Sequence, residues 1–236
     1  MPLSRTLERF REHTRAGTLP AAVSVFDLDS TLYSTQERNL AILREYVARD
    51  EAPGILRQIV DGLEASHMKW NPMEDVYHRG FTDERGQKAL RRYWYERFFS
   101  SEYVKHDRPM PGAVEFVREV YDAGACVVYL TGRPDKGMGA GTRASLEAHG
   151  FPLGGERALL LLKPEFSEPD LAFKRRAVED IRALGPVYAA FENEPANANL
   201  FHDAFPDADI YFLETVCSPD PPPLRQRIVK VKDFLK

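Results

Sequence analysis

The stretch VFDLDSTLY, Val25–Tyr33, places two aspartates directly after an apolar run. The run Ala22–Asp27 has the length and the consecutive apolar residues of a strand that is covered on both faces. In such a strand Asp27 and Asp29 emerge on the same side at the carboxyl end, because Leu28 points the opposite way. Two carboxylates this close repel each other unless a cation lies between them or one is protonated. A divalent cation that prefers oxygen ligands, such as Mg²⁺, would relieve the repulsion.

Four further apolar runs of strand length follow along the chain, with helical patterns between them. The expected strands are Cys126–Thr131, Ala158–Leu162, Val187–Glu192 and Asp209–Leu213. The expected helices are Gly112–Ala123, Thr142–His149, Asp170–Leu184 and Ala196–Ala204. Strands that alternate with helices predict an α/β fold with a Rossmann-like, doubly wound parallel sheet.

The interval between the first two predicted strands is far longer than a single crossover helix needs. Three segments in it carry apolar residues at three- and four-residue spacing, as amphipathic helices do: Gln36–Arg49, Ile55–Ser66 and Thr82–Ser100. An insertion after the first strand would lie above the carboxyl ends of the strands, where open α/β sheets bind ligands. We therefore expect a core formed by residues 1–33 and 107–236 and a helical cap formed by residues 34–106.

The composition excludes several classes of protein. The 236 residues are 43% hydrophobic, enough for a full core, and the formal net charge of −4 gives no indication of a nucleic-acid partner. Cys126 and Cys217 have no metal-type spacing and are too few for a disulfide framework, which is typical of a reducing cytosol. No run reaches the length of a membrane span, and the first residues contain no apolar leader. We expect a cytoplasmic monomer or homodimer that does not act at a membrane.

The opening stretch resembles motif I of the haloacid dehalogenase (HAD) superfamily of phosphohydrolases, which reads D-x-D-x-[TV] after an apolar strand. Three further stretches resemble the other motifs of that superfamily, in the same order. They are VVYLTGRP at Val127–Pro134 for motif II, FKRRAVEDI at Phe173–Ile181 for motif III, and YAAFENEPANANLF at Tyr188–Phe201 for motif IV. The resemblance extends from about Ala21 to Leu213, and it implies a HAD core with a helical C1-type cap.

The resemblance assigns roles to the residues of motifs I and II. Asp27 would be a metal ligand and the nucleophile that forms an aspartyl-phosphate. Asp29 would protonate the leaving oxygen, then deprotonate the attacking water, and meet the metal through its backbone carbonyl. The dehalogenases that gave the superfamily its name lack this second carboxylate, so its presence indicates the phosphatase branch. Thr131 and the backbone around Gly132 would bind a phosphoryl oxygen.

Motif III supplies a lysine close to the phosphoryl group, where its charge stabilises the transition state. Lys174 lies at the start of the helix before the fourth predicted strand, and its sequence context matches capped phosphatases. Lys163 follows the third predicted strand in LLLLKPE and resembles the Lys-Pro form of other HAD members. The resemblance favours Lys174 as the catalytic and phosphate-binding lysine and leaves Lys163 as the second choice.

Motif IV departs from the family pattern, which has two aspartates. Glu192 takes the position of the metal-binding acid, and its longer side chain can still present an oxygen to Mg²⁺. Asn197 takes the later position, so Asn193 and Asn197 remain possible ligands. An amide there can orient water without adding charge. We expect Glu194 to be a loop residue or an acid at a helix start instead of a ligand.

The end of the expected cap, RRYWYERFFSSEYVKHD at Arg91–Asp107, is dense in aromatic and basic residues. These side chains could stack on a base or a sugar and steer phosphate. The pairs Trp94/Phe98 and Tyr95/Phe99 are also four residues apart, as in ordinary helix packing. Both interpretations stay open from the sequence.

The motifs together predict a Mg²⁺-dependent phosphomonoester hydrolase that acts on a small phosphorylated metabolite. A phosphotransferase or phosphomutase would use the same aspartyl-phosphate and deliver it to an acceptor hydroxyl. A phosphate- or metal-binding module without turnover is a third possibility, because motif IV is unusual. The presence of Asp29 argues against this third possibility, since a binding module has no need of an acid/base group.

Overall fold

A six-stranded parallel sheet forms the centre of the molecule, in the order β5-β4-β1-β6-β7-β8. The strands are β1 Val23–Phe26, β4 Cys126–Pro134, β5 Ala158–Lys163, β6 Val187–Glu192, β7 Asp209–Leu213 and β8 Val229–Val231. The computed structural model describes residues 2–235. The predicted α/β, Rossmann-like fold class is confirmed.

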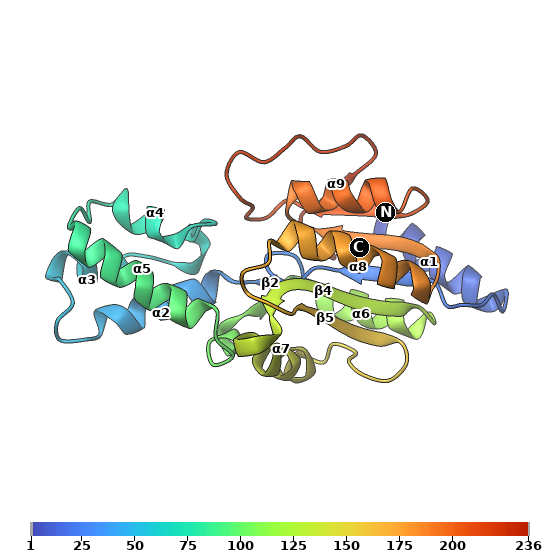
Figure 1. The fold of residues 1–236 in the computed structure, drawn as a ribbon, viewed down its shortest axis with the longest axis horizontal. Coiled ribbons are helices and arrows are strands. Elements are labelled where there is room, and N and C mark those ends of the chain that lie inside the picture. Colours follow the sequence, from blue (N-terminus) through green and yellow to red (C-terminus); the bar gives the residue numbers. More distant parts are fainter. Residues whose placement is uncertain (1, 236) are drawn as a thin grey trace.

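Helices cover both faces of this sheet (Figure 1). They are α1 Pro2–Arg15, α6 Ala113–Asp122, α7 Asp135–His149, α8 Asp170–Leu184 and α9 Pro195–Ala204. Alternate residues of β4 enter the two cores: Val127 and Tyr129 pack with α1 and α6, whereas Val128 packs with α8 and α9. Burial on both faces explains why these strands are continuous apolar runs.

Two elements of this part of the molecule are absent from the prediction. β8 is the three-residue segment Val-Lys-Val at the edge of the sheet, too short to give a strand signal. The helix α1 buries Leu3, Leu7 and Phe10, and its dense charges hide this spacing in the sequence. The other predicted strands and helices are confirmed, with β4 continuing to Pro134 and α7 starting at Asp135.

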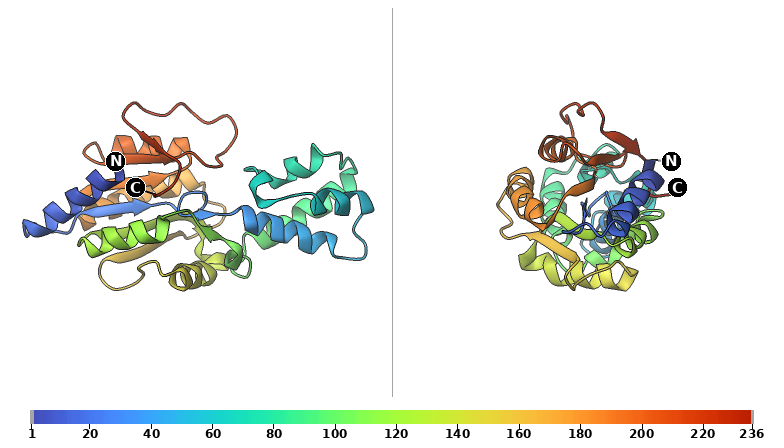
Figure 2. Two further views of the ribbon diagram at one scale, coloured as in Figure 1. Left: turned by 180° about the vertical axis from the view of Figure 1, so that it is seen from behind. Right: turned by 90° about the vertical axis from the view of Figure 1, so that its right-hand side faces the viewer.

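The helices α2 Gln36–Val47, α3 Gly54–Asp61, α4 Pro72–Tyr77 and α5 Glu84–Phe98 form a separate group at one end of the long axis (Figures 1 and 2). They pack around their own apolar cluster, which includes Leu43, Leu56, Val60 and Leu90. The helix expected over Ile55–Ser66 ends at Asp61 instead, and the 3₁₀ turn η1 Ala65–His67 follows it. The separate cluster supports our proposal that residues 34–106 form a cap.

Two short segments connect this group to the sheet. They are β2 Tyr33–Ser34 on the way out and β3 Arg108–Pro109 on the return, and they pair as antiparallel strands. Since β2 follows the carboxyl end of β1, the cap helices lie beyond the carboxyl edge of the sheet. Within residues 2–235, every helix is too short or too polar to cross a lipid bilayer.

Candidate active site

Three of the predicted site residues lie at neighbouring strand ends. β1 lies between β4 and β6, with Phe26 opposite both Tyr129 and Phe191. The carboxyl ends of parallel strands share one edge of the sheet. Asp27, Thr131 and Glu192 therefore come together there, and all three line the same cavity.

The loop after β1 turns sharply and directs the second aspartate toward the cap. Ser30 has a φ of 59°, a left-handed conformation that few residues other than glycine adopt. The turn is closed by backbone hydrogen bonds from Ser30 to Tyr33 at 2.6 Å and from Tyr33 to Leu28 at 2.9 Å. Leu28 is fully buried, whereas the Asp29 side chain is 34% exposed and lines the cavity. The two carboxylates are thus held in different surroundings.

Lys174 joins two of the buried acids. Its Nζ donates to Asp27 Oδ1 and to Glu192 Oε2, each at 2.6 Å. All three residues are buried. Burial opposes the charge on Lys174, but the two carboxylates outweigh it and raise the pKa of the lysine above its usual range. The helix α8 therefore carries a permanent positive charge to the end of β1.

Asp27 has a strongly perturbed carboxyl group. Burial, followed by the negative charge of Glu192, raises the pKa of Asp27 from 3.8 to about 7, and Lys174 offsets only part of this effect. Lys174 offsets only part because two buried carboxylates share its one ammonium group. Perturbed groups of this kind are concentrated at functional sites.

Asp29 faces a pair of arginines. Arg133 donates from Nε to both carboxylate oxygens at 3.2 and 3.1 Å and from Nη2 to Oδ1 at 2.5 Å. Arg38 donates from Nη2 to the same Oδ1 at 3.1 Å. Burial would raise the pKa of Asp29, but the charges of Arg133 and Arg38 outweigh burial and lower it to about 2. Asp29 is therefore a charged carboxylate in this form of the protein.

Asp107 completes the ion-pair cluster between the cap and the core. It is fully buried and accepts from Arg38 Nε and Arg133 Nη2, each at 2.7 Å, and also from Arg38 Nη2. Arg38 belongs to the cap helix α2, while Asp107 is on the returning segment beside β3. The cluster thus ties both connections of the cap to Asp29. Sequence reasoning missed Arg38 and Arg133 as site residues. The position of Arg133 directly after Thr131-Gly132 is a signal for Arg133 alone, and the sequence holds no comparable signal for Arg38.

The two candidate lysines differ clearly in their surroundings. Lys163 donates to Asp170 Oδ1 at 2.6 Å and does not line the cavity, whereas Lys174 does.

The segment after Thr131 packs closely against the start of α8. Asp170 lies against Gly132, where a Cβ atom would meet its carboxylate at 2.3 Å. A side chain at position 132 would therefore displace Asp170 at the edge of the cavity. Thr131 is 1% exposed, and its Oγ1 accepts from the backbone N–H of Arg133 at 3.2 Å.

The residues of motif IV have distinct partners. Glu192 Oε1 accepts from the backbone N–H groups of Asn193 and Glu194, each at 3.0 Å. The Asn193 side chain accepts from Thr31 at 3.1 Å and donates to the Val216 carbonyl at 2.7 Å. Glu194 accepts from Ser218, at 2.9 Å from its N–H and 2.6 Å from its Oγ. Glu194 thus binds the loop that contains Ser218.

The acids at this site fit a divalent cation in part. Among the described residues, no three His, Cys, Asp or Glu side chains converge as a metal cluster, because the Asp29 carboxylate turns to the arginines. Asp27 and Glu192 do face the same ammonium group, and when both are ionised they carry one negative charge more than it balances. Two carboxylate oxygens with an excess of negative charge are suitable donors for Mg²⁺.

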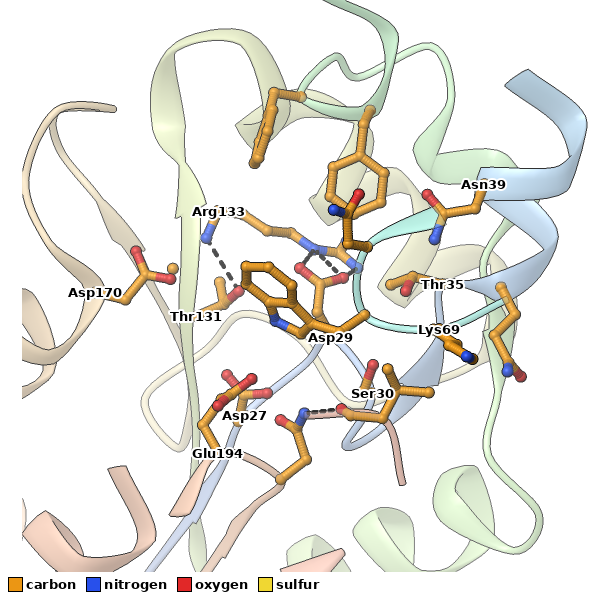
Figure 3. Close-up of a pocket in the computed structure, with 18 of the residues that line it drawn as sticks. Asp27, Asp29, Ser30, Thr35, Asn39, Lys69, Thr131, Arg133, Asp170 and Glu194 are labelled. Carbon is orange, nitrogen blue, oxygen red and sulfur yellow. Dashed lines mark hydrogen bonds and ion pairs between the residues drawn. The ribbon is translucent and has the colours of Figure 1, made fainter. Parts of the chain in front are cut away.

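A cavity of about 460 Å³ opens above these residues, between the sheet and the cap. Figure 3 shows Asp27, Thr131 and Asp170 on one side of it and Thr35, Asn39 and Lys69 on the other. The cap also contributes aromatic side chains to the lining, which are Trp70, Trp94, Tyr95, Phe98 and Phe99. A volume of this size accommodates a small organic ligand in addition to a phosphate group.

Comparison with known proteins gives matches among solved structures only, since neither a protein-family model nor a curated protein sequence matches the chain. A predicted phosphoglycolate phosphatase from Haemophilus somnus is 15% identical, with a TM-score of 0.56, covering 90% of this chain and 94% of that one. Protein tyrosine kinase A of Mycobacterium tuberculosis is 12% identical, with a TM-score of 0.55 and coverages of 90% and 94%. A HAD-superfamily hydrolase of subfamily IA from Geobacter sulfurreducens is 14% identical, with a TM-score of 0.51 and coverages of 90% and 92%. The chain therefore shares the fold of these proteins, one of which is a HAD-superfamily hydrolase, in agreement with the fold that its four motifs predict.

Proposed function

We propose that this protein is a Mg²⁺-dependent phosphomonoester hydrolase that acts through an aspartyl-phosphate on Asp27. The observation that carries the proposal is the buried group formed by Asp27, Lys174 and Glu192 at the carboxyl edge of the sheet. The HAD fold and the four motifs in family order support the same conclusion. A pair of acids exposed on the surface would not support the proposal, because exposed acids are common on any protein surface.

In the first step, an Asp27 oxygen attacks phosphorus as the ester P–O bond breaks, and the leaving oxygen takes a proton from Asp29. In the second step, Asp29 takes a proton from water, which attacks the phosphoryl group and releases Asp27 and phosphate. Lys174, Thr131 and the backbone at Gly132 stabilise the negative charge on the phosphoryl oxygens in both steps. Lys174 is proposed for this role in preference to Lys163 because it contacts Asp27 directly.

The two states of Asp29 have different requirements. The form described here holds Asp29 as a carboxylate, which is the state needed to accept a proton from water. Protonation of the leaving oxygen needs a proton on Asp29, and such a proton is compatible with this site only when Arg133 or Arg38 withdraws. Because Arg38 lies on the cap helix α2, movement of the cap would be coupled to the protonation of Asp29.

The side chains of Asp27 and Glu192 would hold Mg²⁺, and the family resemblance adds the backbone carbonyl of Asp29. Asn197 is buried, lines the cavity and has no side-chain hydrogen bond within residues 2–235, so it is the better of the two possible amide ligands. When bound, the cation would neutralise charge on the phosphoryl group.

The proposal is tested by phosphate release from a panel of phosphorylated metabolites, with and without Mg²⁺ and with an added sugar as acceptor. Free phosphate is expected, and phosphorylated sugar in its place would identify a phosphotransferase. The variant Asp27→Asn, verified as folded, is the control and should release no phosphate. Release by this variant at a normal rate would overturn the assignment of the nucleophile.

A further inference from the structure

Two polar side chains at the start of α2 lie against the cavity with unused hydrogen-bonding groups. Thr35 and Asn39 are 8% and 3% exposed, and both line the cavity. Within the described chain, the Thr35 hydroxyl and the Asn39 Nδ2 have no hydrogen-bond partner, even though Thr35 is the residue that precedes the helix. Both groups are accessible from the cavity, so each is available to pair with a polar ligand that binds on the cap side.

The orientation of Asn39 follows from its contact with Trp94. The indole Nε1 of Trp94 donates to Asn39 at 2.8 Å. An indole N–H can only donate, so the amide atom that faces it must be the oxygen. The amide NH₂ is thereby directed away from Trp94, and the cavity side presents a donor to an acceptor on the ligand.

Aromatic rings surround this donor. Trp94 stacks on Phe98, with ring centroids 4.9 Å apart and planes 29° from parallel, and Phe99 and Tyr95 continue the surface. Trp70 lies on the cavity from another part of the cap and is 53% exposed. A large, partly exposed aromatic surface beside a fixed donor favours a flat ring with an acceptor atom.

The charges on the cap side agree with an anionic or neutral ligand. Lys69 and Arg91 line the cavity, and neither forms an ion pair in the part of the chain that the structure describes. The acids that line the cavity, Asp27, Asp29, Asp170, Glu192 and Glu194, all belong to the core. The cap residues that line the cavity therefore offer no carboxylate to a cationic ligand.

We propose that the cap selects a phosphomonoester whose leaving group carries a planar aromatic ring with a hydrogen-bond acceptor, bound by Thr35, Asn39 and Trp94. This inference rests on the proposed phosphatase function, because the phosphate is assigned to the core residues. A nucleoside monophosphate and an aryl phosphate with an acceptor atom in its ring, such as 3-pyridyl phosphate, both have this chemistry. They differ in the spacing between phosphorus and ring, which the experiment distinguishes.

Binding can be measured without catalysis, because both tryptophans of the chain, Trp70 and Trp94, line the cavity. Tryptophan fluorescence is recorded while adenosine, AMP, 3-pyridyl phosphate or ribose 5-phosphate is added. We expect saturable changes with the ligands that contain an aromatic ring and none with ribose 5-phosphate. Equal responses to AMP and ribose 5-phosphate, or no response to any ring, would overturn the inference.

Catalysis is then compared for two matched pairs of substrates, AMP with ribose 5-phosphate and 3-pyridyl phosphate with cyclohexyl phosphate. In the wild type we expect the KM of at least one aromatic member to be about tenfold lower than that of its partner, from stacking of one ring. The pair in which the KM of the non-aromatic member exceeds that of the aromatic member by the larger factor shows whether the ligand is a nucleotide or an aryl phosphate. Ratios near one in both pairs would contradict the inference and leave the phosphatase proposal standing. No phosphate release from any substrate would instead contradict the phosphatase proposal, while the fluorescence titration still tests the ring site.

Two variants test the assigned residues. Asn39→Leu removes the donor, and Trp94→Phe keeps a ring but removes the N–H that orients the amide. Both should raise the KM of the aromatic member of the preferred pair about tenfold relative to the KM of its non-aromatic partner. Tyr93→Phe is the matched control, since Tyr93 lies on the same helix but its hydroxyl donates to Glu45 and does not line the cavity. An unchanged ratio in both folded test variants would contradict the assignment.

Discussion

Arg133 binds the carboxylate of Asp29 through Nε and Nη2, across 104 residues of sequence and at distances of 2.5 to 3.2 Å. The pair keeps the proposed acid/base group charged, whereas the neighbouring Asp27, the proposed nucleophile, has a raised pKa. Two carboxylates two residues apart thus acquire opposite properties from their surroundings. This separation is typical of acid/base pairs in active sites.

The variant Asp29→Asn should discriminate between leaving groups. A p-nitrophenolate ion leaves without a proton, so the first turnover of p-nitrophenyl phosphate should stay fast and release about one equivalent before the reaction stalls. An alkyl phosphate needs the proton, and its first turnover should slow by about 10²–10⁴-fold. Rapid-mixing measurements of both substrates check this. Equal slowing of the two first turnovers would contradict the acid role of Asp29.

The variant Lys174→Met should affect stability and activity far more than Lys163→Met. Removal of Lys174 leaves Asp27 and Glu192 buried without their cation, which costs about 3–5 kcal/mol in the free energy of unfolding. Lys163 pairs with Asp170, whose side chain is 56% exposed, so its loss should cost about 1 kcal/mol or less. Urea denaturation without metal, together with phosphate release, measures both effects. The opposite order would assign the catalytic role to Lys163.

The variant Glu192→Ala should raise the Mg²⁺ concentration needed for half-maximal activity much more than Glu194→Ala. Glu192 shares Lys174 with Asp27, whereas both oxygens of Glu194 are occupied by Ser218. Mg²⁺ titration of phosphate release gives the comparison, with thermal denaturation as the check on folding. A larger effect in Glu194→Ala would mean that the metal site has been placed on the wrong acid.

The metal-free protein should lose stability as the pH rises toward neutrality, because of Asp27. A carboxyl whose pKa is raised from 3.8 to about 7 binds its proton more tightly in the folded state. The folded state then pays a growing penalty as the pH rises from about 4 to about 7, and the penalty is complete above that range. Asp27→Asn lacks this penalty, so its stability relative to wild type should increase over the same range. Denaturation in the presence of a chelator tests this, and a constant difference between the two proteins would refute it.

Much of the candidate site can be predicted from the sequence, because several of its residues lie at the ends of strands. Asp27, Thr131 and Glu192 each follow a continuous apolar run, and parallel strands bring their carboxyl ends together. The choice between Lys174 and Lys163 is harder, because both lie close to the same edge of the sheet. It depends on which direction each side chain takes, and spacing along the chain does not determine that.

The cluster of Arg38, Asp107 and Arg133 could not be predicted in the same way. Arg38 lies on a cap helix, and its contact with Asp107 spans 69 residues. Such a contact depends on how the cap packs against the core, for which helical periodicity carries no information. The sequence also leaves open whether Trp94 and Phe98 pack within the helix or contact a ligand. In the structure they stack on each other and also line the cavity, so the structure is compatible with both interpretations.

The central claim is that Asp27 carries the phosphoryl group during turnover, and rapid acid quenching followed by peptide mass spectrometry tests it most directly. The protein is quenched during turnover of p-nitrophenyl phosphate with Mg²⁺, with folded Asp27→Asn as the blank. We predict a phosphoryl group on the peptide that contains Asp27 in the wild type and none in the variant. Turnover with the phosphoryl group on a different residue, or undiminished turnover by Asp27→Asn, would contradict the proposed mechanism.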